Sequence, residues 1–137
     1  MYALGRTFNT LAVADDVYVP LIDANGVSFI CYNTAGDTWT LTEAKDAAGT
    51  SAAVLATITR WYTQATVGAV WVTRTQTAAS TVVTTSSQDV AVIEVDGVEL
   101  SDGFDWIKLA STSTGTVTAV LRDLNVQRKA DNLTALV

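Results

Sequence analysis

The side chains that could do chemistry in this chain are almost all carboxylates, because its 137 residues include no histidine and a single cysteine. Without histidine the chain lacks the usual general base at neutral pH and the commonest metal ligand. One cysteine can form no intramolecular disulfide, and it nearly excludes a structural zinc site. Cys31 lies in an apolar run, and we interpret it as a buried apolar side chain, not as a reactive thiol.

Two carboxylate pairs are the only hydrolytic candidates. Asp102 and Asp105 lie close together in one turn-like segment, and Asp15 and Asp16 are adjacent in another. A glycosidase needs two carboxylates across a cleft, at a separation that the fold sets. We interpret both pairs as solvated turn residues, and the GxSxG, GxxxxGK[ST] and GxGxxG motifs are absent. The sequence therefore predicts no catalytic residues, no cofactor and no enzymatic activity.

The segment Asp23-Ala24-Asn25-Gly26 resembles the first half of a calcium-binding loop, but no glutamate stands at the closing position. Asn-Gly between two β-rich runs is instead the strongest short signal for a hairpin. We therefore predict a hairpin that joins strands over residues 16–22 and 27–33, and no metal site.

The chain has four tryptophans, which could form a carbohydrate-binding platform. Trp39 lies on the apolar face of a predicted strand and Trp61 on an apolar stripe, so both are predicted to be core residues. Trp71 and Trp106 lie opposite their apolar neighbours and are candidates for exposure. We favour a place in the core or in a subunit interface over a sugar platform, which stays an alternative.

Charge and hydropathy limit the partners. The formal net charge is −6, and the eight basic residues are scattered. Nucleic-acid binding needs a basic patch that displaces counterions from phosphate, so no nucleic-acid partner is expected. No apolar run reaches the roughly 18 residues of a membrane span, and the start lacks the apolar core of a signal peptide. We expect a protein that is made in a cytoplasm and does not bind membranes.

Abundant threonine and valine and repeated period-two alternation predict an all-β fold. Residues 103–128 read as two long strands joined by a polar hairpin loop, and further strands are expected over 38–43, 67–75, 80–85 and 90–95. With turn signals at intervals of roughly ten residues, eight to ten short strands favour a mainly antiparallel β-sandwich. A jelly-roll-like arrangement or a closed barrel is the alternative.

One stretch departs from the period-two alternation that is typical of strands. Over residues 52–63 apolar side chains recur at helical spacing, so we predict one short helix there in preference to a strand. The whole chain, 1–137, is predicted to be a single β-sandwich domain with an N-terminal arm over 1–10 and a C-terminal tail over 129–137. The arm is either flexible or a first edge strand. The tail carries apolar side chains, so it either frays or packs on a neighbouring subunit.

The chain resembles small virion proteins of tailed bacteriophages, several of which are capsid decoration, or cement, proteins. The likeness covers about half the chain. It rests on a Ser-Asp-Gly-aromatic turn at residues 101–104, a closing strand ending Asp-Leu-x-Val-x-Arg at 123–128, and the short tail with Asn132 and Leu133. Residues 41–49 and the pair Trp61-Tyr62 are similar to the same group.

The resemblance implies a structural protein that binds the outer surface of a phage capsid and stabilises it. Its partners would be the major capsid protein and other copies of itself, most often as a homotrimer. It would be made in the host cytoplasm and end on the exterior of the virion. A head-completion or tail component is the alternative within the same class. The residues proposed to contact the capsid lie at the end of the closing strand and in the tail: Arg128, Lys129, Asn132, Leu133 and Leu136.

Overall fold

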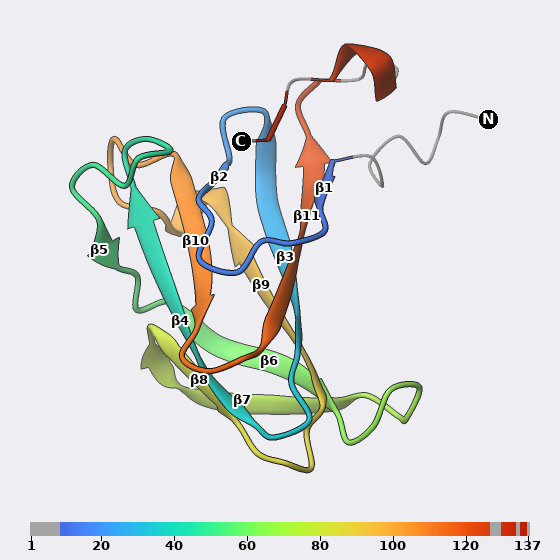
Figure 1. The fold of residues 1–137 in the computed structure, drawn as a ribbon. Helices are drawn as coiled ribbons and strands as arrows, with labels where there is room; N and C mark the ends of the chain where they lie inside the picture. The colour runs from blue at the N-terminus through green and yellow to red at the C-terminus, as the bar shows by residue number, and fades with distance from the viewer. Residues whose placement is uncertain (1–8, 127–129, 134, 137) are drawn as a thin grey trace.

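The computed structural model describes residues 9–126, 130–133 and 135–136, which form two antiparallel sheets packed face to face (Figure 1). The predicted all-β sandwich is therefore confirmed. In chain order the elements are β1 (Thr10–Leu11), β2 (Val19–Pro20), β3 (Ala24–Tyr32), β4 (Asp37–Ala44), β5 (Ala53–Val54), β6 (Ile58–Gln64), β7 (Val72–Ala79), β8 (Thr81–Thr84), β9 (Val90–Asp96), the 3₁₀ turn η2 (Gly97–Glu99), β10 (Trp106–Ser111), β11 (Thr116–Leu124) and the 3₁₀ turn η3 (Ala130–Asn132).

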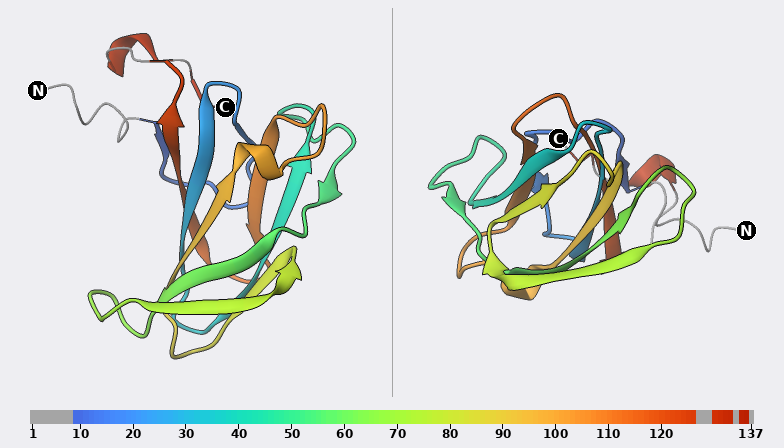
Figure 2. Two further views of the ribbon diagram at one scale, coloured as in Figure 1. Left: turned by 180° about the vertical axis from the view of Figure 1, so that it is seen from behind. Right: turned by 90° about the horizontal axis from the view of Figure 1, so that it is seen from below.

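The two layers differ in size. The six-stranded sheet has the order β1-β11-β3-β9-β6-β7, and the five-stranded sheet has the order β2-β10-β4-β5, with β8 also paired to β4. Figure 2 shows the layers from behind and from below. Among the described residues no ladder joins a strand of one sheet to a strand of the other. The molecule is therefore an open sandwich, and the barrel alternative does not apply.

The chain crosses from one sheet to the other at most of its turns, and this overturns both predicted hairpins. β10 pairs with β2 and β4, whereas β11 pairs with β1 and β3, so residues 103–128 are not a hairpin. β2 and β3 likewise belong to different sheets. Alternation and turn residues identify strands and reversals, but they do not say whether the next strand lies beside the last one or opposite it.

The predicted Asn-Gly turn is wrong, because Asn25 and Gly26 lie inside β3. Gly26 faces Asp96 on one side and Arg122 on the other. A Cβ atom at Gly26 would lie 2.8 Å from the carbonyl oxygen of Val95 and 3.0 Å from Cζ of Arg122. The residue is glycine because neighbouring groups pack closely against it, and not because a turn requires it.

The helix predicted over residues 52–63 is also wrong, since β5 and β6 occupy the segment. The register of β6 against β7 shifts between Ile58 and Arg60. Two steps along β6 here face four steps along β7, so the extra residues of this bulge belong to β7. At the same place Thr59 and Arg60 are both exposed, and Ile58 and Trp61, three positions apart, are both buried. Their spacing imitated a helical stripe, although the backbone is extended.

The remaining strand predictions agree more closely with the structure. β4, β8 and the central β9 match their predicted ranges, whereas β7 begins at Val72 instead of residue 67. Asn9 and Thr10 of the predicted N-terminal arm lie along the edge of β11, where the backbone N–H of Leu121 donates to the carbonyl of Asn9 at 2.9 Å. Residues 1–8 lie outside the described residues.

The core fills the space between the sheets with inward-facing side chains. Cys31 is buried among them, as predicted, and burial raises the pKa of its thiol far above the ordinary value. Trp39 is the largest fully buried side chain, and its Nε1 donates a hydrogen bond to Oγ1 of Thr84 at 3.1 Å. The largest members of this core are Trp39, Phe29, Leu41, Ile93, Ile107 and Leu109.

Replacing Trp39 by alanine should lower the free energy of unfolding by about 3–5 kcal/mol, because it removes a large buried side chain and leaves a cavity. Urea denaturation at neutral pH measures the change. The control is Val83→Ala, since Val83 is 61% exposed in the neighbouring strand β8 and should change stability by less than about 0.5 kcal/mol. Equal midpoints for the two variants would contradict the assignment of Trp39 to the core.

Candidate functional site

Neither predicted carboxylate pair forms a catalytic site. Asp15 accepts a hydrogen bond from the backbone N–H of Ser111 at 2.7 Å, whereas Asp16 forms an ion pair with Lys108. Asp102 and Asp105 are both exposed in the connection between η2 and β10. Asp105 borders a hollow of about 250 Å³ to which Asp102 does not contribute. The carboxylates therefore anchor or solvate loops, and no pair faces a shared cleft.

The structure provides no obvious metal centre in its described part: no three acidic, histidine or cysteine side chains there are grouped to hold a cation. The calcium-like segment 23–26 enters β3, and its backbone is used for pairing. Asp23 accepts at its carbonyl from the backbone N–H of Asn125 at 2.8 Å. Its neighbours therefore continue into a strand, and they do not wrap around an ion.

The tryptophans do not form one platform. Trp39 and Trp61 are buried, as predicted. Trp71 is 46% exposed in the β6–β7 connection, and Trp106 is half-buried at the first residue of β10. The β6–β7 connection and the start of β10 lie at opposite ends of the sandwich (Figure 1). The two indoles therefore cannot bind one sugar chain side by side.

The densest polar cluster surrounds Asp37, which no sequence pattern singled out. Asp37 is 7% exposed at the start of β4. Its Oδ1 accepts from the backbone N–H of Thr38 at 2.7 Å, and from the backbone N–H and Oγ1 of Thr112 at 3.1 and 3.0 Å. Its Oδ2 accepts from Nδ2 of Asn33 at 3.0 Å and from Oγ of Ser111. We call this group the Asp37 cluster.

The Asp37 cluster ties together two connections that cross between the sheets. Asn33 belongs to the β3–β4 connection, and Ser111 and Thr112 end β10 and begin the β10–β11 connection. A Cβ atom at Gly115, in that second connection, would lie 2.6 Å from Oδ2 of Asp37 and 2.3 Å from the Trp39 ring. The cluster is therefore closed to a substrate, and its role is structural.

The hydrogen bonds to Asp37 explain how a buried carboxylate can stay ionised in the folded protein. Burial raises its pKa, but the hydrogen bonds from Ser111, Asn33, Thr112 and Thr38 outweigh burial, so the pKa lies below the ordinary value. A carboxylate whose pKa is lowered by folding stabilises the folded state above its unfolded pKa of about 3.9. That contribution is lost as the pH falls through the lower pKa of the folded state.

Asp37→Asn should lower the free energy of unfolding at pH 7 by about 1–3 kcal/mol, because the amide puts a donor among donors and leaves buried groups unpaired. Urea denaturation between pH 7 and pH 2 should show the difference from the wild type narrowing below about pH 4. Asp105→Asn, at an exposed position, is the matched control and should change little at any pH. A difference that is constant with pH would contradict the role of the charge.

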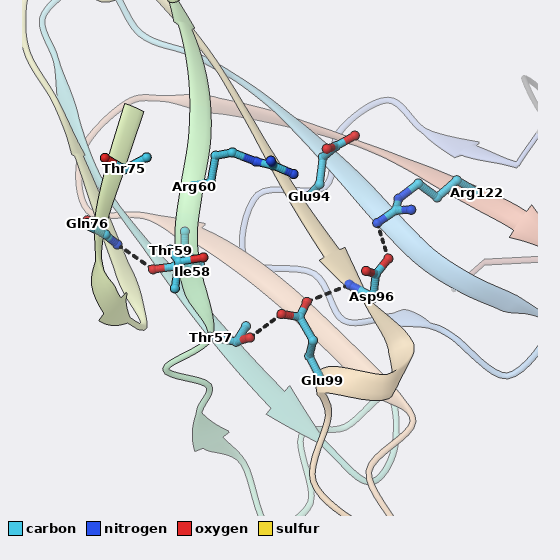
Figure 3. A pocket seen from close by; sticks show the side chains of 10 residues that line it. All are labelled: Thr57, Ile58, Thr59, Arg60, Thr75, Gln76, Glu94, Asp96, Glu99 and Arg122. Atoms are coloured by element: carbon cyan, nitrogen blue, oxygen red, sulfur yellow. Dashed lines mark hydrogen bonds and ion pairs between the residues drawn. The ribbon is translucent and has the colours of Figure 1, made fainter. Parts of the chain in front are cut away.

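A polar hollow of about 630 Å³ lies over β6, β9 and η2 (Figure 3). Several of its charged side chains contact one another or the backbone: Arg122 forms an ion pair with Asp96, and Glu99 accepts hydrogen bonds from Thr57 and from the backbone N–H of Asp96. These contacts connect η2 to β11 and to the chain before β6. We interpret the hollow as a braced surface, because the Glu99 carboxylate is occupied by hydrogen bonds from Thr57 and from the backbone.

The tail residues predicted to contact a capsid are only partly accounted for. Arg128 and Lys129 lie outside the described residues. Asn132 is exposed in η3, whereas Leu133 and Leu136 are half-buried. Leu136 packs against the core of its own chain, and both leucines line a hollow of about 250 Å³ with Trp106. The tail thus covers one open end of the sandwich, and a contact with the capsid stays a prediction.

Leu136→Ala should lower the free energy of unfolding by about 1 kcal/mol, because roughly half of a leucine side chain loses its apolar contacts. Thermal or urea unfolding measures the effect, with Asn132→Ala at an exposed position of the same tail as the control. If both variants match the wild type, Leu136 does not pack on its own domain in solution.

Exposed apolar side chains are concentrated in residues 65–72, which we call the β6–β7 tip. Eleven large hydrophobic side chains are exposed among the described residues, and four of them lie in these eight positions: Val67, Val70, Trp71 and Val72. Most of this segment falls in the strand predicted over 67–75, so its exposure was not predicted from the sequence. The available signal was a run of eight residues, ATVGAVWV, without any charge.

Comparison with known proteins adds no functional site. No protein-family model, curated protein or solved structure matches the chain.

Proposed function

We propose that the protein is a structural component of a phage virion that binds the outer surface of the capsid and stabilises it. The observation that carries the proposal is the placing of the exposed apolar side chains. They lie on the outside of a braced double sheet, most densely at the β6–β7 tip, and not in a cleft lined by reactive groups. Such a surface suits binding to another protein better than it suits catalysis.

Two further features support the proposal. The segments that resemble decoration proteins build the frame of the sandwich: residues 100–126 form β10, β11 and the connection that the Asp37 cluster fixes. Binding at many identical capsid sites also allows a small contact area per copy, because the modest stabilisation from each bound copy adds up over the whole capsid. A homotrimer on the major capsid protein is the arrangement that we infer from the resemblance.

The alternatives have less support. A head-completion or tail component would use the same scaffold at another place in the virion. A carbohydrate-binding module would need a platform, and Trp71 stands without the second tryptophan that was expected beside it. A sugar site would therefore depend on one half-exposed indole and weak additional contacts.

The proposal predicts saturable binding to capsids. The purified protein, mixed with capsids of the encoding phage assembled without it, should co-sediment up to a fixed number of copies per particle. The loaded capsids should open at a higher temperature than bare capsids, since a ligand that binds only the intact state stabilises that state.

Heat-denatured protein serves as the control for trapping during sedimentation. Binding that does not saturate, or bound protein that leaves the opening temperature unchanged, would contradict a stabilising role. Glycan binding that is lost in Trp71→Ala with the fold intact would instead support the carbohydrate-binding alternative.

A further inference from the structure

We infer that the β6–β7 tip is the element that inserts into the partner, and that its receptor is an uncharged, apolar cleft on the capsid protein. The inference rests on the proposed function and names the surface that would carry it out. Figure 1 shows the connection between β6 and β7 projecting beyond the two sheets. A projection can enter a concave receptor that the flat faces of the sheets could not reach.

The tip displays apolar surface to an unusual degree. Val70 is 84% exposed and Val67 is 70% exposed, and Trp71 and Val72 are almost half exposed. Aliphatic and aromatic side chains at such exposure keep their apolar surface in water. The isolated chain therefore gains none of the free energy that burying this surface would give. A tryptophan within an apolar group is the type of residue that most often dominates the energy of a protein interface.

The tip is also held in one conformation. Gln64, which is 9% exposed at the end of β6, donates from Nε2 to the carbonyl of Ala69 at 2.6 Å and accepts at Oε1 from the backbone N–H of Gly68 at 3.4 Å. The backbone N–H of Ala69 donates to the carbonyl of Thr66 at 3.0 Å. Gly68 has a φ of +85°, which only glycine adopts without strain.

The base of the tip is fixed in the same way. The backbone N–H of Asp89, just before β9, donates to the carbonyl of Ala65 at 3.4 Å. The tip is therefore an ordered projection, although none of its side chains is buried. A surface ordered before binding loses less conformational entropy when it binds, so a small apolar contact can give useful affinity.

Charge identifies the kind of receptor. Residues 65–72 contain no charged side chain, in a chain with a net charge of −6. The nearest cation in sequence, Arg74, is directed to β6, where its Nε donates to Oγ1 of Thr63 at 3.2 Å. A loop that inserts into an anionic membrane is usually flanked by lysine or arginine facing the lipid. The tip has no such basic side chain facing outwards beside it in the described part of the chain. Its uncharged, apolar surface therefore fits a neutral apolar cleft on a protein.

A matched pair of variants tests the inference. Val70→Asp puts a charge into the tip, whereas Val98→Asp puts the same charge at a 92% exposed valine in η2. Binding of each variant to decoration-free capsids is measured by co-sedimentation, after equal thermal midpoints show that both are folded. Val70→Asp should weaken binding on the order of tenfold or more, and Val98→Asp should match the wild type.

Hydrogen exchange of the wild-type protein provides a readout that needs no variant. On capsids the backbone amides of residues 65–72 should exchange more slowly than in the free protein. Tight binding by Val70→Asp together with unchanged exchange at the tip would overturn the inference and leave the proposed function in place. Absence of any binding by the wild type would overturn the proposed function, and the capsid receptor with it.

Two other occupants are tested in the same experiment. Sedimentation of the free wild-type protein as an oligomer that Val70→Asp dissociates would assign the tip to a second copy of this chain. Co-flotation of the wild type, but not of Val70→Asp, with phosphatidylcholine vesicles would assign it to a lipid surface. Either result would overturn the assignment to a cleft on the capsid protein.

Discussion

A buried carboxylate that joins two crossing connections is the constraint on which this sandwich depends. The chain passes repeatedly from one sheet to the other, so its turns cannot be fixed by the ladders of a hairpin. Asp37 replaces those ladders by accepting five hydrogen bonds, one from its neighbour Thr38 in β4 and four from residues at the two connections. Through Thr84 the same site also holds the indole of Trp39 in the core. Loop geometry and core packing are thus coupled at one residue.

Much of the remaining surface is polar and offers few sites at which another protein could bind. The edge strand β7 is mainly polar, and Arg74 and Gln76 turn back towards β6, which discourages pairing with another sheet edge. In the hollow beside β9, Arg122 is paired with Asp96. Against this background the uncharged β6–β7 tip is the largest departure from an ordinary soluble surface in the described chain.

Local pattern predicted the strands well and their partners badly. Period-two alternation marked β4, β9, β10 and β11, because side-chain direction along a strand is a local property. The prediction of an Asn-Gly turn failed because position 26 is glycine for another reason: it packs closely against Arg122, nearly a hundred residues away. The helix over 52–63 failed because the in-out alternation of β6 breaks at a register shift, which leaves Ile58 and Trp61 buried at the spacing of a helical stripe. The tryptophan assignments held where an apolar strand face indicated burial.

The sequence by itself determined the all-β class, the buried thiol and tryptophans, and the lack of histidine chemistry, since these follow from composition and from neighbours a few positions apart. Only the tertiary structure decided which strands pair, that Asp37 is a buried organising residue, and that residues 65–72 project as an apolar tip. Those features depend on contacts between segments far apart in the chain. Such contacts are set by how the sheets stack, and no local pattern of residues records that arrangement.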